Sequence, residues 1–240
     1  TKLREGRFPH GLIFSRPEGV GNHTCALMLA KALNCTHAEP GDFSETCSNC
    51  RKLDAGTPRD LVMVSREDDA TQIKIEQIRH VLGLLELHPL EGRNKIFIID
   101  PAKLVNTGAA NALLKGLEEP PASAMFILVS HRPAQHLPTI RSRCVAVPVP
   151  LPAHDKALDW LAKQGVKDAP RWLALAGGAP LRAQEFAARG PAALAPVDTR
   201  DGLEPLADAL QKTALDHALH ELLVLLLGLA VLLLAEADDG

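Results

Sequence analysis

Residues 11–34, GLIFSRPEGVGNHTCALMLAKALN, decide the fold class of this chain, because an apolar run is followed by a glycine-rich turn and then by a helix-like segment. That order is the layout of a phosphate-binding loop. Such a loop needs glycines that let backbone N–H groups close around the phosphates, a lysine that reaches them, and a hydroxyl side chain for magnesium. The sequence therefore predicts an α/β nucleotide-binding frame, whose chemistry has to be checked residue by residue.

The loop keeps two glycines but lacks the residues that carry the chemistry. Gly19 and Gly21 stand where the turn needs them. The departures are Arg16 at the first glycine position, Asn22 at the lysine position and His23 at the hydroxyl position. These three losses predict that the chain does not bind magnesium-ATP tightly, so no ATP is expected as a cofactor.

The second carboxylate region of such a site leads to the same prediction. Asp100 ends the apolar run KIFIID and could hold a metal, but Pro101 follows where an ATPase of this layout carries a glutamate that polarises the attacking water. A glycine pair alone is equally typical of an ordinary strand-to-helix turn. Together with Asp100 it favours a retained frame with an inactive site, in which Asp100 is a vestige.

Four apolar runs predict the strands of a parallel sheet. They span residues 11–15, 61–64, 95–100 and 126–130. Apolar residues at helical spacing lie between the second and third runs, and residues 107–119 predict a helix that is capped by Thr107 and ended by two prolines. This alternation predicts an α/β domain with a parallel sheet over residues 1–150.

Beyond residue 150 the strand-like runs stop and alanine and leucine dominate. The proline-rich segment 147–153 marks the boundary, and a small helical domain is predicted over residues 151–190. For residues 191–240 we expect part of a further helical domain. Its apolar run at residues 222–234 is shorter than the roughly 20 residues that span a bilayer, so no membrane is expected as a partner.

The bulk composition is typical of a globular protein. The formal net charge of the 240 residues is −3, so any DNA contact would need a local basic patch or partner subunits. The chain has five cysteines, an odd number, and its N-terminal segment has no apolar signal core. Both features favour the reducing cytoplasm over a disulfide framework.

Longer motifs resemble one family. The segments FPHGLIFSRPEGVG, AGTPRDL, ANALLKGLEEPP, FILVSHRPAQHLPTIRSRC and LAGGAPLRA are together similar to the bacterial clamp-loader subunits of the AAA+ superfamily, to about residue 188. LLKGLEEPP and IRSRC are the most specific of them. The resemblance implies a RecA-like AAA+ domain, a helical lid domain and the start of a helical collar domain.

Within that family, the degenerate loop combined with an intact Ser142-Arg143-Cys144 is most similar to the non-catalytic stator subunit. That subunit helps to load the sliding clamp onto primed DNA and has no ATPase activity of its own. The alternative is an ATP-hydrolysing subunit of the gamma/tau type, which would keep the lysine and the glutamate. A third function, a small zinc-ribbon adaptor on an unrelated α/β scaffold, leaves IRSRC unexplained.

The resemblance implies that Arg143 acts outside this chain, as an arginine finger that reaches ATP bound by a neighbouring subunit. A guanidinium offers a planar fork of donors where charge accumulates during phosphoryl transfer. Without the resemblance, RSRC is typical of a solvated basic turn. Arg141 would share a face with Arg143 only if the segment were a strand.

The implied assembly is a hetero-oligomer. Its partners would be the gamma/tau and delta clamp-loader subunits and, indirectly, the sliding clamp and primer-template DNA.

The insertion at residues 35–50 carries Cys35, Cys47 and Cys50, the last two as a C-x-x-C pair, and these are candidate zinc ligands. In the family four cysteines bind zinc here, and the missing one falls at Ser44, which is not a usual ligand. The candidates for the fourth ligand are His37, Asp42, Glu45 and water. Zinc is thus a candidate cofactor, and three reduced thiols without a metal are the alternative.

Overall fold

The computed structural model describes residues 9–15, 19–38, 43–44, 46–67, 70–130 and 138–190. Five strands form one parallel sheet in the order β2-β3-β4-β1-β5. The strands are β1 (Gly11–Ser15), β2 (Leu61–Val64), β3 (Lys95–Ile99), β4 (Ala124–Ser130) and β5 (Val145–Pro148). The predicted α/β class with a parallel sheet is therefore confirmed.

Strand β5 is the element of the sheet that the sequence does not predict. Its residues overlap the proline-rich segment that the sequence marks as a boundary, yet Val145 pairs with Leu12 and the strand continues to Pro148. Proline is tolerated because β5 is an edge strand, where one side of the backbone makes no ladder hydrogen bonds.

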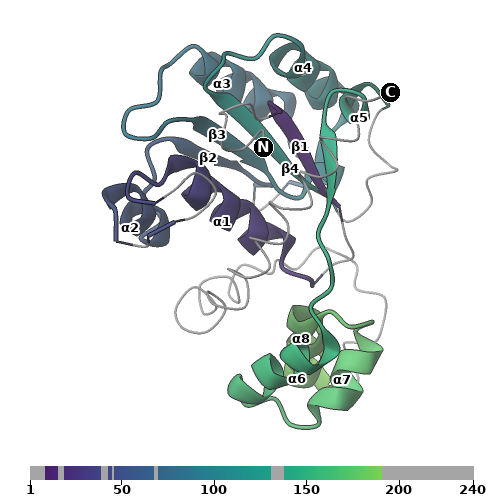
Figure 1. Cartoon of the computed structure of the whole chain (residues 1–240). Coiled ribbons are helices and arrows are strands. Elements are labelled where there is room, and N and C mark those ends of the chain that lie inside the picture. Colours follow the sequence, from purple (N-terminus) through teal and green to yellow (C-terminus); the bar gives the residue numbers. More distant parts are fainter. Residues whose placement is uncertain are drawn as a thin grey trace, which may run out of the picture.

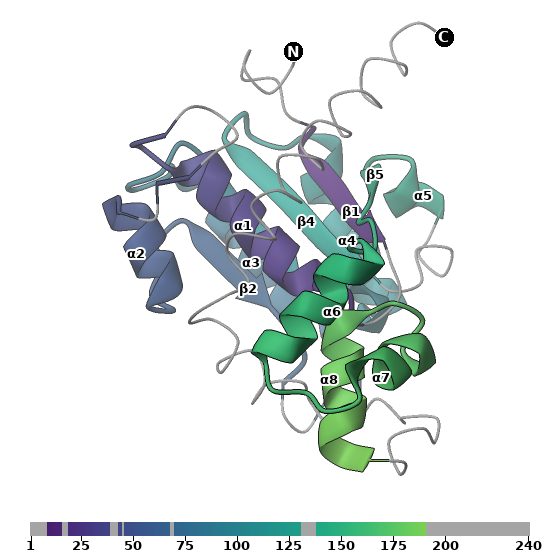
Figure 2. The same cartoon turned by 60° about the horizontal axis from the view of Figure 1, so that its bottom comes forward.

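Helices cover both faces of the sheet (Figure 2). Helix α1 (Asn22–Asn34), with α2 (Ser48–Asp54) beside it, packs on one face, and α3 (Ile75–Leu85) and α4 (Thr107–Glu118) pack on the other. Successive strand residues alternate between the two cores: Leu12 and Phe14 face α1, whereas Ile13 faces the α3 and α4 side. Because both faces are buried, the strands read as continuous apolar runs.

The start of α4 differs from the prediction by one residue. Asn106, not Thr107, is the N-cap, and its side-chain oxygen accepts a hydrogen bond from the N–H of Ala109 at 2.8 Å. Asparagine and threonine are both good caps, so their order in the sequence does not decide between them. A short 3-10 helix (Ala102–Leu104) precedes this cap.

Three helices follow the sheet: α6 (His154–Lys163), α7 (Ala169–Leu175) and α8 (Pro180–Arg189). They pack around buried Trp160, Leu161, Leu173 and Phe186. Figure 1 shows this unit at the opposite end of the sheet from the short helix α5 (Pro138–Arg141).

The helical domain predicted for residues 191–240, with its apolar run at 222–234, lies outside the described residues. Within the part of the chain that the structure describes, no helix has the length and apolar character needed to cross a membrane.

Candidate functional site

The glycine loop joins β1 to α1 at the carboxyl end of the sheet. Gly19 and Gly21 adopt positive φ values of 82° and 94°, a backbone region that favours glycine, and Gly21 is the N-cap of α1. The next residue, Asn22, is buried at 3% exposure. The predicted turn is therefore present, whereas Arg16 lies outside the described residues.

Gly19 also lies directly against the start of α8. The backbone N–H of Leu181 donates to the Gly19 carbonyl at 3.2 Å. A Cβ added at Gly19 would lie 2.4 Å from Cβ of Arg182 and 2.8 Å from its backbone nitrogen. The guanidinium of Arg182 lies 5.2 Å from the ring centroid of Phe186, one turn further along α8. Helix packing thus requires a glycine at position 19, whatever the loop binds.

His23 and Asp100 meet at this end of the sheet. Nδ1 of His23, in the first turn of α1, lies 2.7 Å from Oδ2 of Asp100, which follows β3, and the carboxylate oxygen accepts this hydrogen bond. Their side chains are 41% and 16% exposed. In a magnesium site of this layout the groups at both positions would face the metal. Here the imidazole engages the carboxylate instead, a contact that the sequence places nearby but does not predict.

Arg143 lies at the amino end of the strands, opposite the glycine loop. A Cβ added at Gly11, the first residue of β1, would lie 2.7 Å from Sγ of Cys144 and 3.2 Å from the carbonyl oxygen of Arg143. From there β1 runs for about 13 Å, at roughly 3.3 Å per residue, before the glycine loop begins. Arg143 and the His23–Asp100 pair are therefore separated by the length of the central strands.

Three contacts hold the guanidinium of Arg143. Nη2 lies 2.7 Å from Oε1 of Glu118 at the end of α4, and Nη1 donates to the carbonyl of Thr139 at 3.0 Å and to Oγ of Ser142 at 3.3 Å. The side chain of Arg143 nevertheless stays 35% exposed. The place of Glu118 in the LEEPP motif hints at an interface role, but the sequence does not predict its contact with Arg143.

The neighbours of Arg143 have different environments. Arg141 belongs to α5, so the condition that would put both arginines on one face of a strand is not met. Cys144 is partly buried, and burial raises the pKa of its thiol to about 12. Cys144 therefore acts as a packing residue beside Gly11 rather than as a reactive thiol.

The three predicted ligand cysteines come together. The Sγ atoms of Cys35, Cys47 and Cys50 all lie within 4.8 Å of one another, and all three residues are buried. Cys35 follows the end of α1, Cys47 is the N-cap of α2 and Cys50 lies in its first turn. The arrangement could hold a metal ion.

Backbone N–H groups point at the sulfur atoms. The N–H of Ser44 donates to Sγ of Cys35, and that of Cys50 to Sγ of Cys47, each at 3.3 Å. Burial acts to raise the pKa of Cys47, but hydrogen bonds from Thr36 and Cys50 outweigh it and lower this pKa to about 6. Burial and the neighbouring cysteines raise the pKa of Cys50 to about 12. The thiol of Cys47 thus loses its proton more readily than the thiol of Cys50.

None of the three side chains predicted as candidates for a fourth ligand is placed at the cluster by the described residues. His37 is exposed and is not among the groups that the described residues bring to the cluster. Asp42 and Glu45 lie outside the described residues. Ser44, in contrast, lies against the cluster, with its Oγ 3.6 Å from Sγ of Cys35.

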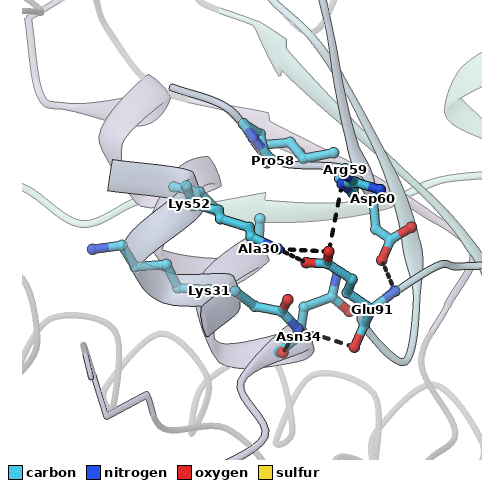
Figure 3. Close-up of a pocket in the computed structure, with 11 residues that line it drawn as sticks. Ala30, Lys31, Asn34, Lys52, Pro58, Arg59, Asp60 and Glu91 are labelled. Carbon is cyan, nitrogen blue, oxygen red and sulfur yellow. Dashed lines mark hydrogen bonds and ion pairs between the residues drawn. The ribbon is translucent and has the colours of Figure 1, made fainter. Parts of the chain in front are cut away.

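A polar network anchors the cysteine insertion to the sheet (Figure 3). The side-chain amide of Asn49, between the two cysteines of the C-x-x-C pair, donates to the carbonyls of Asn34 at 2.9 Å and Glu91 at 3.2 Å. Nζ of Lys52 lies 2.6 Å from Oε1 of Glu91, and Figure 3 shows Arg59 turned toward the same carboxylate. These contacts join α2 to the loop that precedes β3.

Comparison with known proteins finds clamp-loader relatives. The chain is 36% identical over 186 residues to DNA polymerase III subunit delta' of Pseudomonas aeruginosa, covering 75% of this chain and 56% of the relative. It is 36% identical over 157 residues to DNA polymerase III subunit tau/gamma of Haemophilus influenzae, covering 65% of this chain and 22% of the relative. The chain therefore spans about half the length of the delta' relative and less of the other.

A solved structure shares the fold. It is a DNA polymerase III gamma subunit-related protein of Thermotoga maritima, with a TM-score of 0.54, 22% identity and coverage of 91% of this chain and 68% of that one.

A family model described as "DNA polymerase III, delta subunit" matches residues 1–152, which is more than half of the chain. With the delta' relative, this match confirms the predicted resemblance to bacterial clamp-loader subunits, and among them it supports the delta-prime subunit. The protein belongs to the DNA polymerase III delta-subunit family.

Proposed function

We propose that the protein is the non-catalytic stator subunit of a DNA polymerase III clamp loader and supplies Arg143 in trans to ATP held by a neighbouring subunit. The proposal rests on where these residues lie along the strands. The His23–Asp100 contact is at the carboxyl end of the strands, and Arg143 is at their amino end. An arginine that cannot reach the loop of its own chain can serve phosphates only on another chain.

The contacts of Arg143 suit this role. A finger has to be exposed enough to enter a neighbouring site, and positioned well enough that little freedom is lost when it does. The side chain of Arg143 is 35% exposed, and the bonds of its guanidinium to Glu118 and to the carbonyl of Thr139 restrict its orientation. At the neighbour's γ-phosphate, the same N–H groups would donate to oxygens on which negative charge accumulates.

The second candidate is an ATP-hydrolysing subunit of the gamma/tau type, because the tau/gamma relative is as identical to this chain as the delta' relative, at 36% each. Asn22 and Pro101 argue against it, since neither can replace a lysine or a glutamate in phosphoryl transfer. The engagement of Asp100 by His23 adds a third argument.

We also propose that Cys35, Cys47 and Cys50 hold zinc. Thiolates are usual zinc ligands, and buried sulfur atoms within 4.8 Å of one another suit a single ion. Zinc at this position would have a structural role, because it would join the end of α1 to the start of α2. The cysteines themselves would release their protons on binding.

The wider assembly follows from the same proposal. The partners are gamma/tau and delta subunits, with the sliding clamp and primer-template DNA contacted through the complex. The AAA+, lid and collar domains would occupy residues 1–150, 151–190 and 191–240. A cytoplasmic location remains a prediction.

The test is Arg143→Ala in a reconstituted clamp loader in which the ATPase sites other than the adjacent one are disabled. The variant is expected to assemble, while hydrolysis at the adjacent site falls by about 10³- to 10⁵-fold, the range typical of arginine fingers. Arg143→Lys should rescue poorly, because an ammonium group cannot reproduce the planar fork. Arg141→Ala, an exposed arginine on α5, is the matched control and should leave the rate unchanged.

The role in trans would be refuted by a complex that contains the Arg143→Ala subunit at normal stoichiometry and hydrolyses ATP at the adjacent site at the unmodified rate.

A further inference from the structure

The cysteine cluster is one donor short of the closed tetrahedral shell that is usual for structural zinc. Within the described part of the chain, the acidic, histidine and cysteine side chains that gather there are the three cysteines alone. A fourth donor must therefore be a group of another kind, a group from outside the described residues, or water.

Ser44 lies at the cluster through three separate contacts. Its Oγ is 3.6 Å from Sγ of Cys35, its backbone N–H donates to the same sulfur at 3.3 Å, and its Oγ accepts from the N–H of Cys47 at 3.2 Å. The hydroxyl oxygen thus lies between Sγ of Cys35 and the backbone N–H of Cys47. Ser44 is also less exposed than Ser48, which lies on the outside of the same insertion.

We propose that Oγ of Ser44 fills the fourth corner of the metal site, so that three thiolates and one neutral oxygen bind the ion. This inference rests on the proposed metal site and is independent of the role of Arg143. Zinc accepts oxygen ligands, but a neutral hydroxyl gives the ion less charge than a thiolate does. The ion is consequently held less tightly than by four thiolates and exchanges more readily through the Ser44 corner.

The test is a titration of the full chain with cobalt(II) and zinc(II), the second read by competition with a chromophoric chelator. Ser44→Cys is expected to bind zinc more tightly by at least about 10-fold and to strengthen the sulfur-to-cobalt charge-transfer absorption, because a fourth thiolate joins the shell. Ser44→Ala is expected to weaken zinc binding by about 10-fold, the lower end of the range typical of losing a supporting group in a metal site.

Ser48→Cys is the matched control. It adds a thiol to the same insertion at an exposed position in the first turn of α2, so the affinity and the cobalt spectrum should stay those of the unmodified chain. If Ser44→Ala binds zinc as tightly as the unmodified chain, the hydroxyl is not a ligand and the inference is overturned. It is overturned also if Ser44→Cys changes neither readout, or if Ser48→Cys changes both equally, because Ser44 then does not face the ion. If the unmodified chain binds neither metal, the proposed metal site fails together with it, while the role of Arg143 is untouched.

Discussion

Gly19 shows, at the scale of one residue, that a glycine of the phosphate-loop motif can be required for helix packing when the loop lacks the residues that bind phosphate. The motif assigns this glycine to a phosphate loop, but its positive φ and its contact with Arg182 show a second demand, which is the close approach of α8. A side chain at position 19 would have to displace helix backbone, not only fill the loop. The glycine is thus needed even if no phosphate ever binds.

The substitution Gly19→Ala is therefore expected to destabilise the protein strongly. The left-handed backbone costs about 1–2 kcal/mol for a residue with a Cβ, and overpacking against Arg182 adds about 1–3 kcal/mol. The free energy of unfolding, measured by denaturant titration, is the readout. Gly56→Ala is the control, because Gly56 has a φ of 70° but nothing within 4 Å of an added Cβ. Equal losses in the two variants would rule out the packing argument.

The sequence identifies most of the site residues but not the side chains that they contact. The positions of His23 and Asp100 in the frame were predictable from the loop and from the strand end, whereas their 2.7 Å contact depends on a rotamer of His23 that no pattern encodes. Likewise the LEEPP motif marked Glu118 without showing that it binds Arg143. Contacts of this kind join segments far apart in the chain and depend on the finished fold.

At the scale of the elements, the apolar runs predicted four strands well because buried parallel strands are continuously apolar. The sequence does not predict the two elements whose local residue preferences differ from the structure that tertiary contacts impose. Val145–Pro148 contains proline and forms a strand only because β1 offers it a free edge. Pro138–Arg141 forms a short helix in a segment for which the sequence left open a strand.

Asp60 shows how the element boundaries are held. Its carboxylate accepts hydrogen bonds from the backbone N–H groups of Leu90, Glu91 and Gly92, each at 2.7 Å. Burial acts to raise the pKa of Asp60, but these three N–H groups and the charge of Lys95 hold it below its ordinary value. The residue ties the entry of β2 to the loop before β3, next to the anchored cysteine insertion (Figure 3).

Asp60→Asn is accordingly expected to lower the free energy of unfolding by about 2 kcal/mol at neutral pH, as for other buried hydrogen bonds to a charged group. A depressed pKa in the folded state stabilises the protein above the unfolded pKa, near 4, and this stabilisation is lost as the pH falls through the folded value. The difference between variant and unmodified protein should hence shrink below about pH 4.

Thermal or denaturant unfolding across that pH range is the measurement for Asp60. Glu67→Gln is the control, because the Glu67–Lys74 pair is more than half exposed and should contribute little. A difference between Asp60→Asn and the unmodified protein that stays constant from pH 7 to pH 3 would contradict the ionic account.

At the scale of the whole molecule, the length of the sheet's strands separates the degenerate glycine loop from Arg143. At the carboxyl end of the strands, the glycine loop packs against α8 and His23 contacts the carboxylate of Asp100. At their amino end, Arg143 is partly exposed. Gly19 lies against the start of α8, and Arg143 follows α5; Figure 1 shows α8 and α5 at opposite ends of the sheet. This separation is the observation on which the proposed role of Arg143 in trans rests.

The most direct test of this account is a calorimetric titration of the chain with magnesium-ATP. We expect no binding in the micromolar range, and none for Asn22→Lys, because a restored lysine leaves Asp100 engaged by His23 and proline at position 101. A dissociation constant of about 1 μM or tighter for the unmodified chain, equivalent to about 8 kcal/mol, would show that the loop binds nucleotide and would contradict the account.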